Sequence, residues 1–128
     1  MSTHRRRQRL TFSEFWKLYL VAHRKPATRL CHYLATIIGI LATIISALFD
    51  ELLVLVGGIS CAVALAVGSH HLIERNKPLI AVNPFYGALA DLRMCWLALT
   101  GGLQREYVRL GLETAPEPAG GLVKQTTV

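Results

Sequence analysis

The sequence predicts an all-α integral membrane protein, built as a compact bundle of about four helices. Two observations lead to this fold class. The 128 residues are 52% hydrophobic and only 17% charged, against roughly a quarter charged in ordinary soluble domains. Eight of the 14 Lys and Arg residues precede residue 30, and none lies between Leu30 and Ile73. A soluble protein with a buried helical hairpin is the alternative.

Two uncharged runs predict two clear transmembrane spans. The first run covers residues 30–49 and the second covers residues 52–73, with Asp50 and Glu51 between them. A hydrocarbon core of ~30 Å needs about 20 apolar residues at ~1.5 Å per residue, so each run is long enough to cross. We therefore expect two antiparallel helices joined by a tight acidic turn.

A shorter helix is expected before this hairpin. Its start carries a capping-box pattern, Thr11 and Glu14, and Pro26 disfavours helical geometry just before it. Between them, aromatic residues recur at helical spacing on one face. This segment is too short and too charged for another long span, and its aromatics suit a membrane interface.

A fourth helix is expected after Pro84, either spanning or half-inserted, because Asp91 and Arg93 interrupt its apolar pattern. The domain division that follows is a basic disordered tail (1–10), a helical membrane domain (11–112) and a flexible tail (113–128). The last segment is rich in Pro, Gly and Thr.

The basic residues predict the orientation of the chain. They lie in the N-terminal segment and at Arg75 and Lys77, whereas the turn at 50–51 has none. Because Lys and Arg collect in cytoplasmic loops, we expect the N-terminus and the histidine-rich end on the cytoplasmic side, in a bacterial inner membrane or an ER-like membrane. The net charge of +6 is thereby explained without a nucleic-acid partner. Self-association as a homo-oligomer stays open.

Several histidines are expected at one membrane face. In an antiparallel hairpin, His32 near the start of one helix and His70 near the end of the other lie at the same side. His23 closes the first helix just before a short turn back to that side. The candidates for this cluster are His23, His32, His70 and Glu74, with His71 and Asp91 as further members.

Such a cluster predicts a metal site. Neutral imidazoles with a carboxylate suit non-haem Fe(II), with zinc as the alternative. Glu74, one turn after His70, can either bind the metal or orient that histidine. The competing interpretations are interfacial histidines without a function and a bis-histidine haem, which suits clustered carboxylates less well. The sequence shows no nucleophile elbow, P-loop or HExxH motif.

Two stretches resemble a known family. "FWKLYLVAHRKPATRLCHYLATIIG" (15–39) and "GSHHLIERNKPLIAVNPFYGALADLRMCW" (68–96) are similar to the small membrane family of 2-hydroxy fatty acid dioxygenases. Its fungal members act in phytosphingosine breakdown, and its many bacterial members are uncharacterised. The resemblance spans roughly residues 12–105. Ser69, where the family usually has Gly, and His71, where an aromatic or apolar residue is common, depart from the pattern.

The resemblance implies an enzyme that uses Fe(II) and O2 to shorten a 2-hydroxy fatty acid by one carbon. The residues that match the family motif and would act in catalysis are His23, His32, His70 and Glu74. Asn76 also matches, and we expect it to contact the substrate together with Arg29, Arg75 or Arg93. The alternatives are a non-catalytic membrane scaffold or lipid-binding protein and a zinc-dependent membrane hydrolase.

Overall fold

The computed structural model describes residues 9–112, so the expected tail 113–128 and most of the expected tail 1–10 lie outside it. The described chain is all-helical and contains no strand. In order, its elements are α1 (Phe12–Val21), α2 (Pro26–Phe49), α3 (Leu52–Ser69), the π-helical turn η1 (His70–Glu74), the 3-10 turn η2 (Leu79–Ala81), α4 (Pro84–Leu99) and α5 (Leu103–Arg109).

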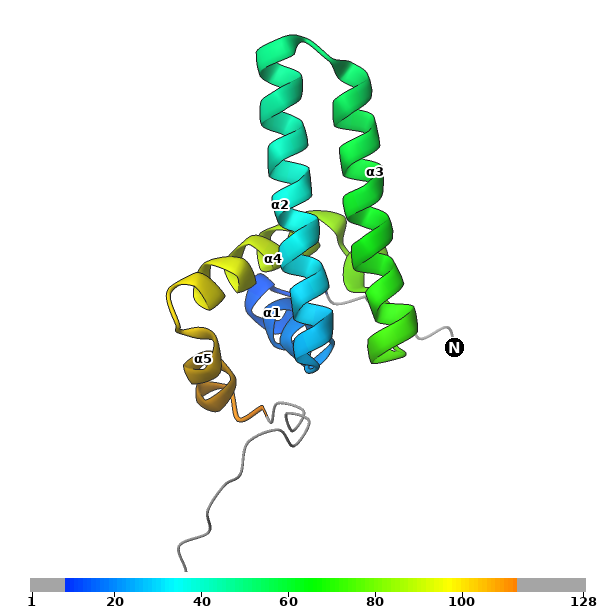
Figure 1. Cartoon of the computed structure of the whole chain (residues 1–128). Helices are drawn as coiled ribbons and strands as arrows, with labels where there is room; N and C mark the ends of the chain where they lie inside the picture. The colour runs from blue at the N-terminus through cyan, green and yellow to red at the C-terminus, as the bar shows by residue number, and fades with distance from the viewer. Residues whose placement is uncertain (1–8, 113–128) are drawn as a thin grey trace, which may run out of the picture.

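Helices α2 and α3 form a long antiparallel hairpin that projects from the rest of the molecule (Figure 1). Pro26 at the first turn of α2 fits its start, since that position needs no backbone donor. Asp50 adopts left-handed geometry with φ of 55° and ends the helix. The two helices approach closely at Gly58, where an added Cβ would collide with the Cβ of Ala42.

The surface of this hairpin is apolar. Both helices are long and apolar enough to cross a membrane, and within their apolar windows only 17% and 11% of the residues are buried. A core helix in a soluble protein would be mostly buried. Near the tip, Leu48, Phe49 and Leu53 are 72%, 70% and 82% exposed. Most of the residues in these apolar windows are therefore not buried within the described chain, which weakly favours membrane spans over the predicted soluble alternative.

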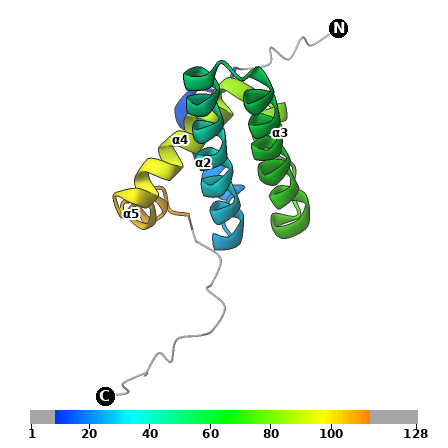
Figure 2. The same ribbon diagram turned by 45° about the horizontal axis from the view of Figure 1, so that its top comes forward.

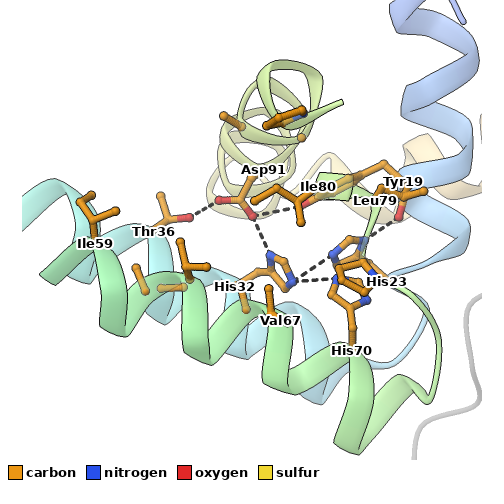
Figure 3. A pocket seen from close by; sticks show the side chains of 18 residues that line it. Tyr19, His23, His32, Thr36, Ile59, Val67, His70, Leu79, Ile80 and Asp91 are labelled. Atoms are coloured by element: carbon orange, nitrogen blue, oxygen red, sulfur yellow. Dashed lines mark hydrogen bonds and ion pairs between the residues drawn. The ribbon is translucent and has the colours of Figure 1, made fainter. Parts of the chain in front are cut away.

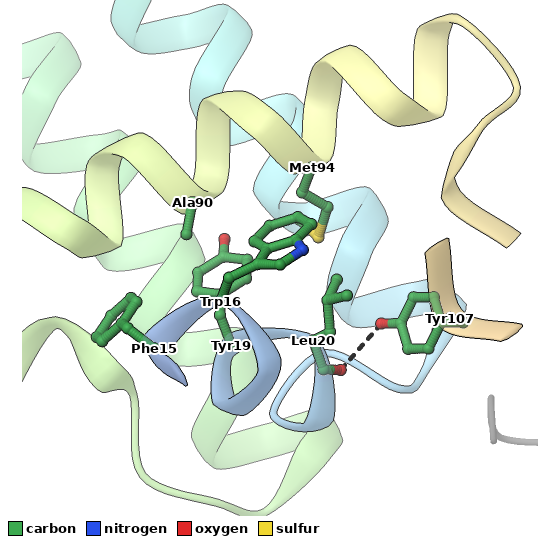
Figure 4. Packing of buried hydrophobic residues seen from close by; sticks show 7 residues of the cluster. All are labelled: Phe15, Trp16, Tyr19, Leu20, Ala90, Met94 and Tyr107. Carbon is green, nitrogen blue, oxygen red and sulfur yellow. Dashed lines mark hydrogen bonds between the residues drawn. The ribbon is translucent and has the colours of Figure 1, made fainter. Parts of the chain in front are cut away.

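The buried core lies at the base of the hairpin, where α1, α4 and α5 gather around the lower half of α2 (Figures 1 and 2). Helix α1 begins with the predicted capping box, in which Thr11 and Glu14 each bind the other's backbone amide. Its aromatic face packs under α4 (Figure 4). The buried members of this core are Phe15, Trp16, Tyr19, Leu20, Ala90, Met94 and Tyr107.

The C-terminal helical segment differs from the single fourth helix that was expected. Helix α4 ends at Leu99, Gly101 turns the chain with φ of +75°, and a separate α5 follows. The Tyr107 hydroxyl then donates to the carbonyl oxygens of Leu20 and His23, at 2.9 Å each, and fixes α5 against the end of α1. The described chain therefore has five α-helices, and α4 is not among the two that meet the length and composition of a span.

Candidate metal centre

Three histidines from three segments meet at the base of the hairpin (Figure 3). His23 follows the end of α1, His32 lies in the second turn of α2, and His70 begins η1 at the end of α3. The Nε2 atom of His32 lies 3.1 Å from Nε2 of His23 and 3.2 Å from Nε2 of His70. One nitrogen from each ring lies within 4.8 Å of the other two. The predicted convergence of these imidazoles is therefore present in the fold.

The opposite nitrogen of each ring faces an acceptor. Nδ1 of His23 lies 2.6 Å from the backbone oxygen of Tyr19, and Nδ1 of His32 lies 2.9 Å from Oδ1 of Asp91. Nδ1 of His70 lies 2.8 Å from Oδ1 of Asn76. Carbonyl, carboxylate and amide oxygens only accept, so each Nδ1 carries the hydrogen. In the neutral rings all three Nε2 lone pairs therefore point into one small space.

Local backbone geometry explains how Asn76 reaches His70. The π-helical turn that begins at His70 ends at Arg75, which is left-handed with φ of 57°. This reversal lets the backbone amide of Asn76 donate to the carbonyl oxygen of His70 at 3.0 Å. The Asn76 side chain also donates to the carbonyl oxygen of Ala22 at 3.1 Å. One asparagine thus ties the end of α3 to the segment that carries His23.

The surroundings of the His23 ring keep it neutral. All three histidines are buried, and burial, followed by the neighbouring His32, lowers the pKa of His23 to about 2. The Tyr19 ring stacks on the His23 ring with centroids 4.0 Å apart. Neutral imidazoles with free Nε2 lone pairs are the state in which histidine binds a metal.

Asp91 holds His32 in place from α4. Besides the His32 ring, its carboxylate accepts hydrogen bonds from the Tyr19 hydroxyl at 2.9 Å and from the Thr36 hydroxyl. Burial, with the Asp91 charge next, raises the pKa of Tyr19 well above its usual value, so this phenol stays a donor. The carboxylate is thus placed to orient a ring, and its oxygens lie outside the group of three nitrogens.

Tyr19 and Thr36 were not among the predicted site residues. A signal for them exists in the sequence, because Tyr19 lies one helical turn before His23 and Thr36 lies one turn after His32. Both side chains share the face of their neighbouring histidine. That spacing could not show that Asp91 would join the two hydroxyls.

The other predicted metal ligands lie outside the group. Oε1 of Glu74 accepts a hydrogen bond of 2.5 Å from the backbone amide of Lys25 and so caps the start of α2. His71 is exposed, one residue beyond His70. Among the described residues, the atoms placed to share one ion are those of His23, His32 and His70.

The four predicted substrate contacts are engaged elsewhere or point outward. Arg29 donates to the carbonyl oxygens of His23 and Arg24, and Arg93 bonds Glu106. Asn76 supports His70, and Arg75 is exposed at the end of η1. Within the described residues, none of the four lines the cavity beside the histidines. Direct substrate contact by these side chains stays a prediction.

A cavity of about 300 Å³ opens beside the three rings (Figure 3). Its polar wall is formed by Tyr19, Thr36, Asp91 and the three histidines, and the remainder is apolar. The apolar part follows small and branched residues of α2 and α3 toward the middle of the hairpin, and η2 and the start of α4 close another side. The apolar lining is Ala35, Ile59, Ala62, Val63, Ala66, Val67, Pro78, Leu79, Ile80, Pro84, Gly87 and Ala88.

The donor set fits a divalent metal ion. Three neutral imidazole nitrogens, each oriented through its other nitrogen by a protein acceptor, resemble the three-ligand sites that leave coordination positions open. Without a cation, three lone pairs would face one another at close range. Both Fe(II) and zinc accept imidazole ligands, so the donor set alone does not choose between them.

Comparison with known proteins gives a family for the chain. The sequence model of the Mpo1-like family, described as "2-hydroxy-palmitic acid dioxygenase Mpo1-like", matches residues 10–103. Comparisons with curated proteins and with solved structures give no match. The matched range contains α1 to α4 and all three histidines, together with Asp91 and Asn76. This chain belongs to the Mpo1-like family.

Proposed function

We propose that this protein is an Fe(II)-dependent dioxygenase that shortens 2-hydroxy fatty acids by one carbon at the cytoplasmic face of a membrane. The family supports the substrate class and the reaction. The observation that carries metal dependence is the convergence of three Nε2 atoms whose rings are each held through Nδ1. The overall change balances when the substrate and one O2 yield the shorter acid, CO2 and water.

We propose iron as the metal because the reaction transfers electrons to O2. When bound, Fe(II) would supply redox chemistry and open positions for the 2-hydroxyl and carboxylate oxygens of the substrate. His23, His32 and His70 would hold it, and Glu74 would act beyond them by fixing the start of α2 against η1. Asp91 would keep His32 in the tautomer that presents Nε2.

The hairpin would cross the bilayer with its base toward the cytoplasm. Exposed basic residues flank the base, while the turn at the tip carries Asp50 and Glu51. This distribution follows the preference of Lys and Arg for cytoplasmic loops. The basic residues at the base are Arg24, Lys25, Arg75 and Lys77.

The cavity supports an acyl-chain substrate. From His70 to Ile59, α3 contributes 11 residues, or about 16 Å of helix at ~1.5 Å per residue. Its inner face there carries Ala62, Val63 and Ala66 and no charge. An acyl tail would lie along this face, and its polar head would reach the histidines. In this position the bound substrate would also exclude bulk water from the reacting carbons.

An arrangement without a metal is the competing explanation. A proton on Nε2 of His32 would form hydrogen bonds to Nε2 of both neighbouring histidines, and Asp91 would balance the charge. Such a network would only join the helices, as expected of a membrane scaffold. A zinc hydrolase would use the same three ligands with a bound water.

One experiment separates these functions. The protein is purified in detergent without oxygen, its metal is quantified, and 2-hydroxypalmitate is incubated with and without O2. The dioxygenase gives an acid one carbon shorter only when both Fe(II) and O2 are present. Stoichiometric zinc, with O2-independent hydrolysis of an ester of 2-hydroxypalmitate, would show a hydrolase, and a metal-free, inactive protein would support the scaffold.

The position of the acyl tail has its own test. Ala66→Phe would fill the cavity, whereas Ala64→Phe adds the same ring to an exposed position of the same helix. Ala66→Phe should raise KM for long-chain substrates and leave bound metal unchanged, and Ala64→Phe should do neither. Equal KM values in both variants would place the tail elsewhere.

A further inference from the structure

One apolar surface outside the site is not explained by packing in the described chain. Helix α4 carries a stripe of large apolar side chains at spacings of three or four residues, and these are 41–84% exposed. Such spacing keeps the side chains on one helical face. The members of this α4 stripe are Phe85, Leu89, Leu92, Trp96 and Leu99.

The α4 stripe faces away from the protein core. With 3.6 residues per turn, Ala90 and Met94 lie on the opposite side of the helix. Those two residues are fully buried and point onto α1 (Figure 4). In Figure 1, α1 and α5 lie on the side of α4 that is away from the hairpin tip. The stripe is therefore turned toward the side from which the hairpin projects.

The height of α4 along the hairpin places it near lipid. Asp91 bonds His32 and Thr36, so α4 meets α2 about 13 residues before Phe49. Those 13 residues rise about 20 Å, which is less than the ~30 Å hydrocarbon core. When the acidic tip of the hairpin lies at the far headgroups, α4 therefore lies within the near leaflet.

The composition of the α4 stripe also fits a lipid interface. It contains no charge and includes a tryptophan, the residue that collects at the boundary between acyl chains and headgroups. It adjoins the exposed apolar surface of the hairpin. The exposed Arg24, Lys25, Arg75 and Lys77 at the base supply the positive charge that anionic headgroups attract.

We propose that α4 lies in the plane of the membrane, with the α4 stripe inserted among the acyl chains of the near leaflet. This rests on the membrane position of the hairpin in the proposed function but not on metal or activity. The neighbouring face of α4, at Pro84, Gly87 and Ala88, lines the histidine cavity. A lipid substrate would then pass into the cavity sideways from the bilayer, beside the stripe.

Trp96 reports directly on this surface. The described chain has one other tryptophan, Trp16, which is buried, so Trp96→Phe removes the exposed indole and leaves the shielded one. The full protein is reconstituted in phosphatidylcholine–phosphatidylglycerol vesicles, with or without lipids brominated along their acyl chains. The Trp96 signal is the difference between wild type and Trp96→Phe, and aqueous iodide is the second quencher.

Insertion predicts that brominated lipid removes most of the Trp96 emission and that iodide has little effect. Quenching by iodide alone would place the stripe in water, and quenching by neither would show it covered by protein, such as a second copy; both overturn the proposal.

Leu41→Trp in the Trp96→Phe background reports on the hairpin separately, since Leu41 is half exposed in the middle of α2. Lipid quenching at residue 41 but not at 96 rejects the insertion of α4 alone, while quenching at neither rejects the membrane position of the hairpin as well.

Discussion

The base and the tip of the hairpin are stabilised by different interactions. At the base, aromatic side chains and polar groups are buried together, and Nδ1 of each buried histidine faces an oxygen acceptor. Toward the tip, the helices meet through small residues such as Gly58 and Ala42, and large apolar side chains face outward. Burial of apolar area thus holds the base, whereas close backbone approach holds the tip.

This difference separates the site from its support. Buried polar groups are costly unless they are hydrogen-bonded, and the base supplies those hydrogen bonds from α1, α4 and η1. The tip needs only length and small residues to form the hairpin. Substitutions of the residues that hold the histidines should therefore alter metal binding, and substitutions toward the tip should alter helix association alone.

Among the substitutions that test this difference between the base and the tip, Asp91→Asn should have the largest effect. Oδ1 of Asp91 accepts from His32 and Tyr19, and Oδ2 accepts from Thr36. The neutral amide faces the Thr36 hydroxyl with an NH2 donor and lacks the charge that strengthens the bond to His32, so the His32 ring is held less firmly. Loss of such a supporting partner typically weakens metal affinity by about 10–100-fold. Competition with a chelator measures this affinity. Asp50→Asn at the tip is the control, and equal affinity in both variants would contradict the role of Asp91.

Gly58→Ala tests the tip. The new Cβ would collide with that of Ala42, whereas Gly57→Ala meets nothing within 4 Å. Overpacking of this kind costs about 1–3 kcal/mol, while Ala in an open helical position is favoured over Gly by roughly 1 kcal/mol. Thermal unfolding in detergent should show a lower Tm for Gly58→Ala only. Similar Tm values for the two variants would mean that the helices are not in contact there.

A smaller effect, confined to the base, is expected from Glu106→Gln. Glu106 accepts hydrogen bonds from Trp16 at 2.8 Å and from Arg109 at 2.6 Å, and Arg109 lowers its pKa. We expect a loss of about 1–2 kcal/mol at neutral pH. The stabilisation is complete above the carboxyl pKa of the unfolded chain, about 4.3, and disappears as pH falls through the lower folded value.

The pH dependence makes that prediction specific. The difference in Tm between wild type and Glu106→Gln should shrink when pH is lowered from 6 toward 3. Glu51→Gln, at the exposed turn of the hairpin, should change Tm little. A difference that stays constant with pH would show that the charge of Glu106 contributes nothing.

Much of the architecture is predictable from local rules. The uncharged runs give the hairpin, and Thr11 with Glu14 gives the start of α1. An antiparallel hairpin must bring His32 and His70 to one end, so their approach follows from topology. The break at Gly101 was missed because helical propensity continues on both sides of it.

The finer features of the site depend on tertiary geometry. Asn76 reaches His70 only through a π-helical turn and a left-handed Arg75. The periodicity of the sequence predicts neither of these backbone features. The arginines look like substrate contacts in the sequence, yet folding turns Arg29 and Arg93 onto carbonyl oxygens and Glu106. The identity of the carboxylate that contacts His32 depends on how α4 crosses α2.

Metal content is the most direct test of the three-histidine centre. Wild type, His23→Ala, His32→Ala and His70→Ala are purified in detergent without oxygen and analysed for bound metal, with circular dichroism to confirm the fold. His71→Ala, which changes an exposed neighbour, is the matched control. We predict about one iron per chain in wild type and His71→Ala, and strong loss of metal in the other three variants while they remain helical. A folded wild type without metal, or equal metal in all five proteins, would contradict the centre.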